Sequence, residues 1–289
     1  MLSIMAGLSL PVAVNCSILF TEQPVLDRPA AARAAGFDSV EFWWPFPEAT
    51  PPQRDVEGFV SAIEAAGVRL VGLNFAAGDM PAGDRGLVSW PAREAEFRGS
   101  VEIAVRIGER LGTRAFNALY GNRIEGVSAQ EQDDLAAVNL GFAARAVAEI
   151  GGVVLLEPVS GAPRYPLLTA AQVLAVIDRV EREGRRAGTD AGGNLRLLAD
   201  LYHLSVNGDD LDAVIAKDTP RVGHVQIADS PGRHEPGSGK LDLGRRLRDL
   251  QAAGYSGYVA LEYKPSTTTE DSFGWLPRDR RSAAHQETS

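Results

Sequence analysis

Eight short apolar segments recur along most of the chain, separated by stretches that have the spacing of amphipathic helices. The strand candidates are residues 13–20, 39–44, 69–75, 114–120, 153–159, 195–202, 222–229 and 258–264. Between them, segments such as 92–112 and 128–151 carry apolar residues three and four positions apart, which is the period of one helix face. Strands that alternate with helices predict a parallel sheet whose connections are helical.

The number of these units decides between two folds that contain parallel sheets. Eight strands within 289 residues fit a closed (β/α)8 barrel. An open, doubly wound sheet usually has a glycine-rich phosphate turn after its first strand, whereas residues 19–24 (LFTEQP) contain no glycine. We therefore predict one α/β domain over residues 1–289, a single TIM barrel with its core at about 13–276. We expect a loose polar tail at 277–289, and the glycine-rich segment 181–194 on the face opposite the active site.

The composition bears on the partners and the compartment of the protein. The net charge is −9 and the pI is about 5.1, so nucleic acid and anionic membranes are repelled, and we predict neither as a partner. The one basic run, 179–186, is interrupted by glutamates and is typical of a solvated helix end. No segment reaches the roughly 18 apolar residues of a membrane helix. A single cysteine, Cys16, excludes an intrachain disulfide and fits the reducing cytoplasm, where we expect the protein to reside.

Polar residues follow the last four predicted strands at the ends where a barrel places its chemistry. They are Glu157, Asp200, Gln226 and Glu262. Each of them alone could equally form a structural ion pair, but four at equivalent depth on successive strands indicate one site. Three converging carboxylates cannot all stay ionised without a counter-charge, so we predict a divalent cation among them. A ligand set made only of oxygens favours Mg²⁺ or Mn²⁺ over a closed zinc site.

Three further side chains are candidates for substrate binding. His203 follows the sixth strand and could donate a hydrogen bond to a substrate oxygen, or it could be structural. Arg233, in the loop after the seventh strand, suits bidentate binding of a carboxylate, or it could be a surface charge. Lys264 could hold a carboxylate or polarise a carbonyl, and a structural pair with an acid is equally plausible.

Polar residues that lie deeper in the predicted strands have two interpretations. Glu41 and Asn117, on the second and fourth strands, could line the substrate pocket or support the polar cluster from below. His224 lies deeper than Gln226 and is expected to be a core or supporting group. The aromatic run 42–46 (FWWPF) is predicted to form core and pocket wall.

Long motifs are more specific than these spacings, and they carry a family resemblance. The segments are AAGDMPAGDRGLVSWPAREAEFR (76–98), HVQIADSPGRHEPGSGKL (224–241) and GYSGYVALEYKPSTTTE (254–270). Through them the chain resembles the hydroxypyruvate isomerase family of xylose-isomerase-like barrels over most of residues 13–276. The resemblance implies a small hydroxy-oxo acid or sugar as substrate, and an isomerase of the aldose–ketose type.

The resemblance also implies roles for individual residues. A divalent metal would be held by Glu157, Asp200, Gln226 and Glu262. Glu157 and Glu262 would be the acid/base pair that interconverts hydroxypyruvate and tartronate semialdehyde through an enediolate. His203 and Arg233 match positions that related barrels use for substrate contacts.

The chain departs from the family pattern at two places near the substrate. Leu73 precedes Asn74 where relatives often carry histidine, and residues 160–166 (SGAPRYP) replace an asparagine and an Asp-x-Pro-Gly element. A 2-oxo-tetronate isomerase or a ketose 3-epimerase therefore remains an alternative. An inosose-type dehydratase and a non-catalytic sugar-acid binder are less favoured. A helical face such as 92–112 could pack on the barrel or on a second copy in a homo-oligomer.

Overall fold

The computed structural model describes residues 4–5, 7–189 and 192–282. Eight parallel strands close into a barrel, each hydrogen-bonded to the next, with the eighth returning to the first. The strands are β1 (Val12–Asn15), β2 (Ser39–Phe42), β3 (Arg69–Asn74), β4 (Ala115–Asn117), β5 (Val153–Leu156), β6 (Leu195–Asp200), β7 (Val222–Ile227) and β8 (Val259–Leu261). The predicted (β/α)8 barrel is confirmed.

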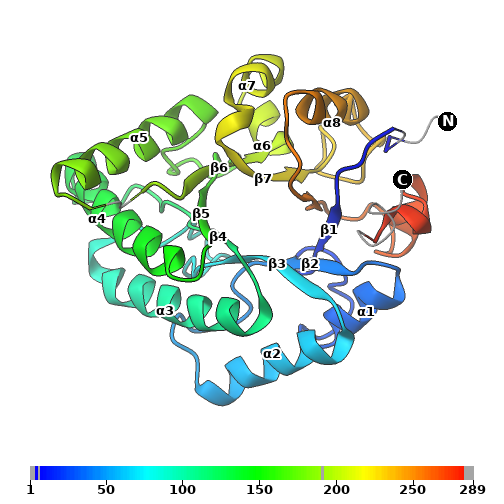
Figure 1. Cartoon of the computed structure of the whole chain (residues 1–289), viewed down its shortest axis with the longest axis horizontal. Helices are drawn as coiled ribbons and strands as arrows, with labels where there is room; N and C mark the ends of the chain where they lie inside the picture. The colour runs from blue at the N-terminus through cyan, green and yellow to red at the C-terminus, as the bar shows by residue number, and fades with distance from the viewer. Residues whose placement is uncertain (1–3, 6, 190–191, 283–289) are drawn as a thin grey trace.

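Helices form a ring around the barrel (Figure 1). They are α1 (Arg28–Ala34), α2 (Gln53–Ala66), α3 (Glu94–Leu111), α4 (Ala129–Ala148), α5 (Ala170–Arg186), α6 (Leu201–Val206), α7 (Leu211–Asp218) and α8 (Leu243–Ala252). Four short 3-10 helices complete the described elements: η1 (Pro91–Arg93), η2 (Thr219–Arg221), η3 (Asp271–Trp275) and η4 (Arg278–Arg280). No helix in the described part of the chain is long and apolar enough to cross a bilayer.

The helices bury one face each against the outside of the barrel. In α2 the buried residues are Val56, Phe59, Val60 and Ile63, which recur at three and four positions. Burying an aliphatic or aromatic side chain of this size contributes about 1.5–3 kcal/mol. The amphipathic period that predicted the helices is therefore also the source of their attachment to the sheet.

Several strands are shorter than the apolar runs that predicted them. The first run extends to residue 20, but the strand ends at Asn15, whose carbonyl accepts hydrogen bonds from the amides of Ile18 and Leu19 in a turn. Ile18, Leu19 and Phe20 remain buried under the loops. Apolar character therefore marks burial rather than strand conformation at these ends.

The prediction of a loose tail from 277 is wrong for its described part. Arg281 donates to the carbonyl of Ala35 at 2.8 Å and lies over the ring of Phe273. Ser282 donates to Asp38 at 2.7 Å. These contacts hold the segment against α1 and the amino end of β2, and residues 283–289 lie outside the described part of the chain.

Candidate active site

The four predicted ligand residues meet at the carboxyl end of the barrel. Asp200 is the last residue of β6 and pairs in register with Gln226 of β7. Glu157 and Glu262 directly follow β5 and β8. Each of the four side chains is less than 10 % exposed. The sheet register therefore brings the predicted residues to one buried level.

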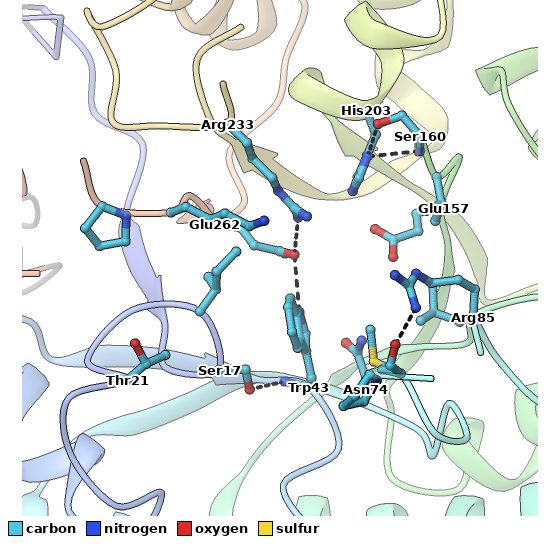
Figure 2. A pocket seen from close by; sticks show the side chains of 17 residues that line it. Ser17, Thr21, Trp43, Asn74, Arg85, Glu157, Ser160, His203, Arg233 and Glu262 are labelled. Atoms are coloured by element: carbon cyan, nitrogen blue, oxygen red, sulfur yellow. Dashed lines mark hydrogen bonds and ion pairs between the residues drawn. The ribbon is translucent and has the colours of Figure 1, made fainter. Parts of the chain in front are cut away.

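Arg233 reaches into this cluster from the loop after β7 (Figure 2). Its Nη2 lies 2.7 Å from Glu262 Oε1 and 3.9 Å from Asp200 Oδ2. Burial acts to lower the pKa of Arg233, but the Glu262 and Asp200 carboxylates outweigh it, so the guanidinium stays charged. In the described residues no three acidic, histidine or cysteine side chains form a ready metal cage. The arginine therefore brings one positive charge to a cluster of three carboxylates.

Two buried oxygens of the cluster nevertheless lack a hydrogen-bond donor. Asp200 Oδ1 caps α6 by accepting from the amides of Tyr202 and His203, whereas Oδ2 accepts no hydrogen bond and has only His203 Nε2 at 3.6 Å and Arg233 Nη2 at 3.9 Å nearby. The Gln226 Nε2 donates to Glu41, which leaves Gln226 Oε1 without a hydrogen-bond partner. An unsatisfied buried acceptor costs about 1–3 kcal/mol. Two such oxygens beside two glutamates fit the oxygen set that Mg²⁺ or Mn²⁺ prefers.

Burial dominates the electrostatics of the two glutamates. It raises the pKa of Glu157 to about 8, with a further rise from Asp200 and an opposing effect of Asn117, whose Nδ2 donates to Oε1 at 3.1 Å. Burial also raises the pKa of Glu262 well above its ordinary value, although Arg233 acts in the opposite direction. Burial therefore disfavours the ionised form of both glutamates, and a nearby cation would favour it.

Glu41 lies beneath the cluster and organises it. Its Oε1 accepts from Asn15 Nδ2 at 2.8 Å and from Gln226 Nε2 at 2.7 Å, and its Oε2 lies 2.7 Å from His224 Nε2. Glu41 is hydrogen-bonded to Gln226, and Asn117 is hydrogen-bonded to Glu157. Both side chains therefore support the cluster from below. His224 is the buried supporting group that the sequence predicted.

A cavity of about 630 Å³ opens above the cluster (Figure 2). The residues that line it and carry polar groups include Ser17, Trp43, Asn74, Arg85, Glu157, Ser160, His203, Arg233, Glu262 and Lys264. Trp43, from the predicted aromatic wall, donates its indole N–H to Glu262 Oε1 at 3.2 Å. The cavity therefore gives a small polar molecule access to both glutamates.

His203 lies in this cavity in one defined tautomer. The Ser160 amide donates to its Nδ1 at 3.0 Å, and the Ser160 hydroxyl lies 2.7 Å from the same atom. Because a backbone N–H can only donate, Nδ1 must be the acceptor, and the proton of the neutral ring is on Nε2. Burial lowers the pKa of His203 to about 4, so the ring stays neutral. It can donate Nε2–H to an oxygen in the cavity, and Ser160, one of the departures, sets this arrangement.

Sequence reasoning did not single out Arg85, which follows β3 and lines the cavity. Its setting between Gly83 and Gly86, after the carboxyl end of a barrel strand, is the signal that could have identified it. Lys264 lines the same cavity but is exposed at its rim.

Comparison with known proteins assigns the chain to a family. The model of the family described as xylose isomerase-like TIM barrel matches residues 29–279. The chain belongs to this family. A protein of Streptomyces coelicolor, provisionally named hydroxypyruvate isomerase, is 51% identical over 93% of this chain and 96% of its own length. The 2-oxo-tetronate isomerase of Cupriavidus necator is 32% identical over 91% of this chain and 96% of its own.

A solved structure supports the same grouping within the xylose isomerase-like barrels. The crystal structure of an AP endonuclease, family 2, from Brucella melitensis superposes with a TM-score of 0.80. It is 31% identical and covers 92% of this chain and 98% of that one. The family resemblance predicted from the sequence is confirmed, and so is the prediction that the chain is an enzyme of the isomerase class.

Proposed function

We propose that the protein is a divalent-metal-dependent isomerase that interconverts hydroxypyruvate and tartronate semialdehyde. The observation that carries this proposal is the pair of buried glutamates, Glu157 and Glu262, in one cavity above two unsatisfied buried oxygens. Glu157, Asp200, Gln226 and Glu262 would hold the ion. When bound, a divalent ion supplies Lewis-acid stabilisation of negative charge on the oxygens of the substrate.

The reaction requires two proton transfers at neighbouring carbons. One glutamate removes a proton from C3 of hydroxypyruvate, which leaves an enediolate, and the other glutamate delivers a proton to C2. The hydroxyl oxygen at C3 becomes the aldehyde oxygen, and the oxygen at C2 gains a proton to become a hydroxyl. His203 Nε2–H is available as a hydrogen-bond donor to one of these two oxygens. General acid–base groups in such positions typically contribute 10²–10⁴-fold to the rate.

The carboxylates need a fixed geometry for these transfers. Glu262 is held by Trp43 at 3.2 Å and by Arg233 at 2.7 Å, and Glu157 by Asn117 at 3.1 Å. These three donors come from different strand ends or loops of the barrel. The scaffold therefore orients both carboxylates before a substrate arrives.

A second candidate is the same isomerisation of a 2-oxo-tetronate. Two observations favour it as the alternative: the similarity to the Cupriavidus necator enzyme, and a cavity of about 630 Å³ that has room for a fourth carbon. The replaced segment 160–166 borders this cavity through Ser160. Ketose 3-epimerisation, inosose-type dehydration and binding without turnover have weaker support.

Turnover of a substrate panel tests the proposal. Protein treated with EDTA and reloaded with Mg²⁺ or Mn²⁺ is incubated with hydroxypyruvate, 2-oxo-tetronate and a ketohexose, and the products are identified by mass spectrometry and NMR. We expect metal-dependent conversion of hydroxypyruvate to an isomer of equal mass, with the largest kcat/KM of the panel. Loss of water from a product, or preference for a ketohexose, would contradict the proposal.

A further inference from the structure

Arg85 presents a guanidinium to the cavity without an acidic partner in the described part of the chain. We propose that Arg85 binds the carboxylate of the substrate and makes the site selective for 2-oxo acids over neutral sugars. This inference rests on the proposed isomerase function and deepens it. Arginine suits the role because its planar fork matches a carboxylate with two parallel hydrogen bonds.

The backbone at Arg85 is held firmly in place. Its carbonyl accepts from the amide of Gly121 at 3.0 Å, and Gly86 forms a bridge with Tyr120. Gly86 has φ +110°, and a Cβ there would lie 1.9 Å from the carbonyl oxygen of Leu119. Only glycine allows this approach of the two backbones. The loop after β3 is therefore fixed to the segment that follows β4, immediately beside Arg85.

The side chain is tethered by one nitrogen only. Arg85 Nη1 donates to the carbonyls of Met80 at 2.9 Å and Asp84 at 2.6 Å. The adjacent acid is already paired, because Asp84 Oδ2 accepts from Arg93 Nη1 at 3.2 Å and from the amide of Asp79 at 2.8 Å. The edge formed by Nε and Nη2 is left for a ligand, and Figure 2 shows the guanidinium facing the cavity. Two parallel N–H groups on one edge can bind a carboxylate in bidentate fashion.

The other cations of the cavity are less suited to this role. The charge of Arg233 is already matched by Glu262 at 2.7 Å, so a substrate carboxylate would compete with an internal one. Lys264 is exposed at the rim, where solvent screens its charge. Arg85 is half-buried, tethered and free of an acid. An anionic substrate that enters a cavity rich in carboxylates requires such a group, so we assign the substrate carboxylate to Arg85 rather than to Arg233.

Paired substrates test the assignment, because dihydroxyacetone differs from hydroxypyruvate by a hydroxymethyl group in place of the carboxylate. Wild type, Arg85→Gln and Arg85→Lys are compared on both. Arg85→Gln should raise KM for hydroxypyruvate on the order of 100-fold, because two charge-assisted hydrogen bonds are lost, and should change kcat/KM for dihydroxyacetone less than 3-fold. Arg85→Lys keeps the positive charge but loses the paired N–H groups, so KM for hydroxypyruvate should rise roughly 10-fold. Equal losses on both substrates, or no loss, would overturn the assignment.

Two further variants control for other sources of the effect. Arg106→Gln removes an exposed arginine of α3 that does not line the cavity, and should leave KM unchanged. Lys264→Gln should raise KM less than 3-fold, and a larger rise there than in Arg85→Gln would transfer the role to Lys264. Thermal unfolding of each variant shows whether the fold persists.

Calorimetry separates this inference from the proposed function. Pyruvate has the carboxylate but no hydroxyl, so it cannot isomerise and reports binding alone. Should wild type turn over none of the substrates, binding of pyruvate to wild type and its loss in Arg85→Gln would still support the assignment. Equal binding to both proteins, or none to wild type, would overturn it.

Discussion

Removal of the Glu41 carboxylate should affect both stability and metal binding, because three buried side chains contact it. Asn15 Nδ2 and Gln226 Nε2 donate to Oε1, and His224 Nε2 lies 2.7 Å from Oε2. Glu41→Ala leaves the Gln226 and His224 nitrogens without an acceptor in a region that is less than 5 % exposed, whereas Asn15 Nδ2 keeps its 3.4 Å hydrogen bond to Glu262 Oε2. An unsatisfied buried donor costs about 1–3 kcal/mol, so the loss of stability from two such donors should be at least about 2 kcal/mol.

This loss can be measured as a change in melting temperature. For a domain of this size, 1 kcal/mol corresponds to roughly 2 °C, so Glu41→Ala should melt about 4 °C or more below wild type. Glu41→Gln is the matched control, since it keeps an acceptor oxygen and the volume of the side chain. It should recover more than half of the difference.

The same substitution should weaken metal binding through Gln226. Glu41 holds the amide nitrogen of Gln226, and without it the amide can rotate and withdraw Oε1 from the cluster. Removal of a partner that orients a ligand typically costs 10–100-fold in metal affinity. Calorimetric titration of EDTA-treated protein with Mn²⁺, well below the melting temperature, measures the change. A Glu41→Ala protein that melts within 1 °C of wild type and binds Mn²⁺ equally would refute this reasoning.

Three more predictions follow from single contacts. Burial raises the pKa of the Cys16 thiol well above its ordinary value. We therefore expect the thiol to stay protonated, and to react with a thiol reagent at pH 8 only after the protein is unfolded. Rapid modification of the native protein would contradict this. Gly86→Ala should destabilise the protein by about 3 kcal/mol or more in denaturant unfolding, because the new Cβ would collide with the carbonyl of Leu119. Gly83→Ala is the control: Gly83 also has a positive φ, +107°, but a Cβ there would meet no atom, so the substitution should cost about 1 kcal/mol. Nitrogen NMR of His203 at pH 7 should show a neutral ring protonated on Nε2, as the Ser160 amide dictates, and a signal from the Nδ1–H tautomer would exclude that role of Ser160.

The fold could be predicted because the sequence signals that define it are local. Apolar period, segment length and the missing glycine turn are all properties of short segments, and the barrel follows from their number. Strand ends could not be predicted, because Ile18 and Leu19 are as buried under loops as they would be in a sheet. The docked tail was also missed, since the contact of Arg281 with Phe273 and the bond of Ser282 to Asp38 depend on tertiary packing.

The cluster at the strand ends was equally accessible from sequence. Barrel topology brings Glu157, Asp200, Gln226 and Glu262 together whatever the loops do. The acidic partners of the two loop arginines could not be predicted from sequence. Arg233 pairs with Glu262, 29 residues away in the sequence. Asp84, the acid next to Arg85, pairs instead with Arg93. Pairing of this kind is decided by loop conformation, and no periodic pattern records it.

The most direct test of the account is whether Glu262 carries a proton to or from the substrate in metal-loaded protein. Hydroxypyruvate is followed by proton NMR in D₂O with wild type and Glu262→Gln, each with and without EDTA. We predict that wild type forms tartronate semialdehyde carrying solvent deuterium at C2 only when metal is present. Glu262→Gln should lose at least 10²-fold in rate while it melts like wild type and still binds pyruvate. A folded Glu262→Gln protein with full activity, or conversion by wild type without deuterium uptake, would contradict the central claim.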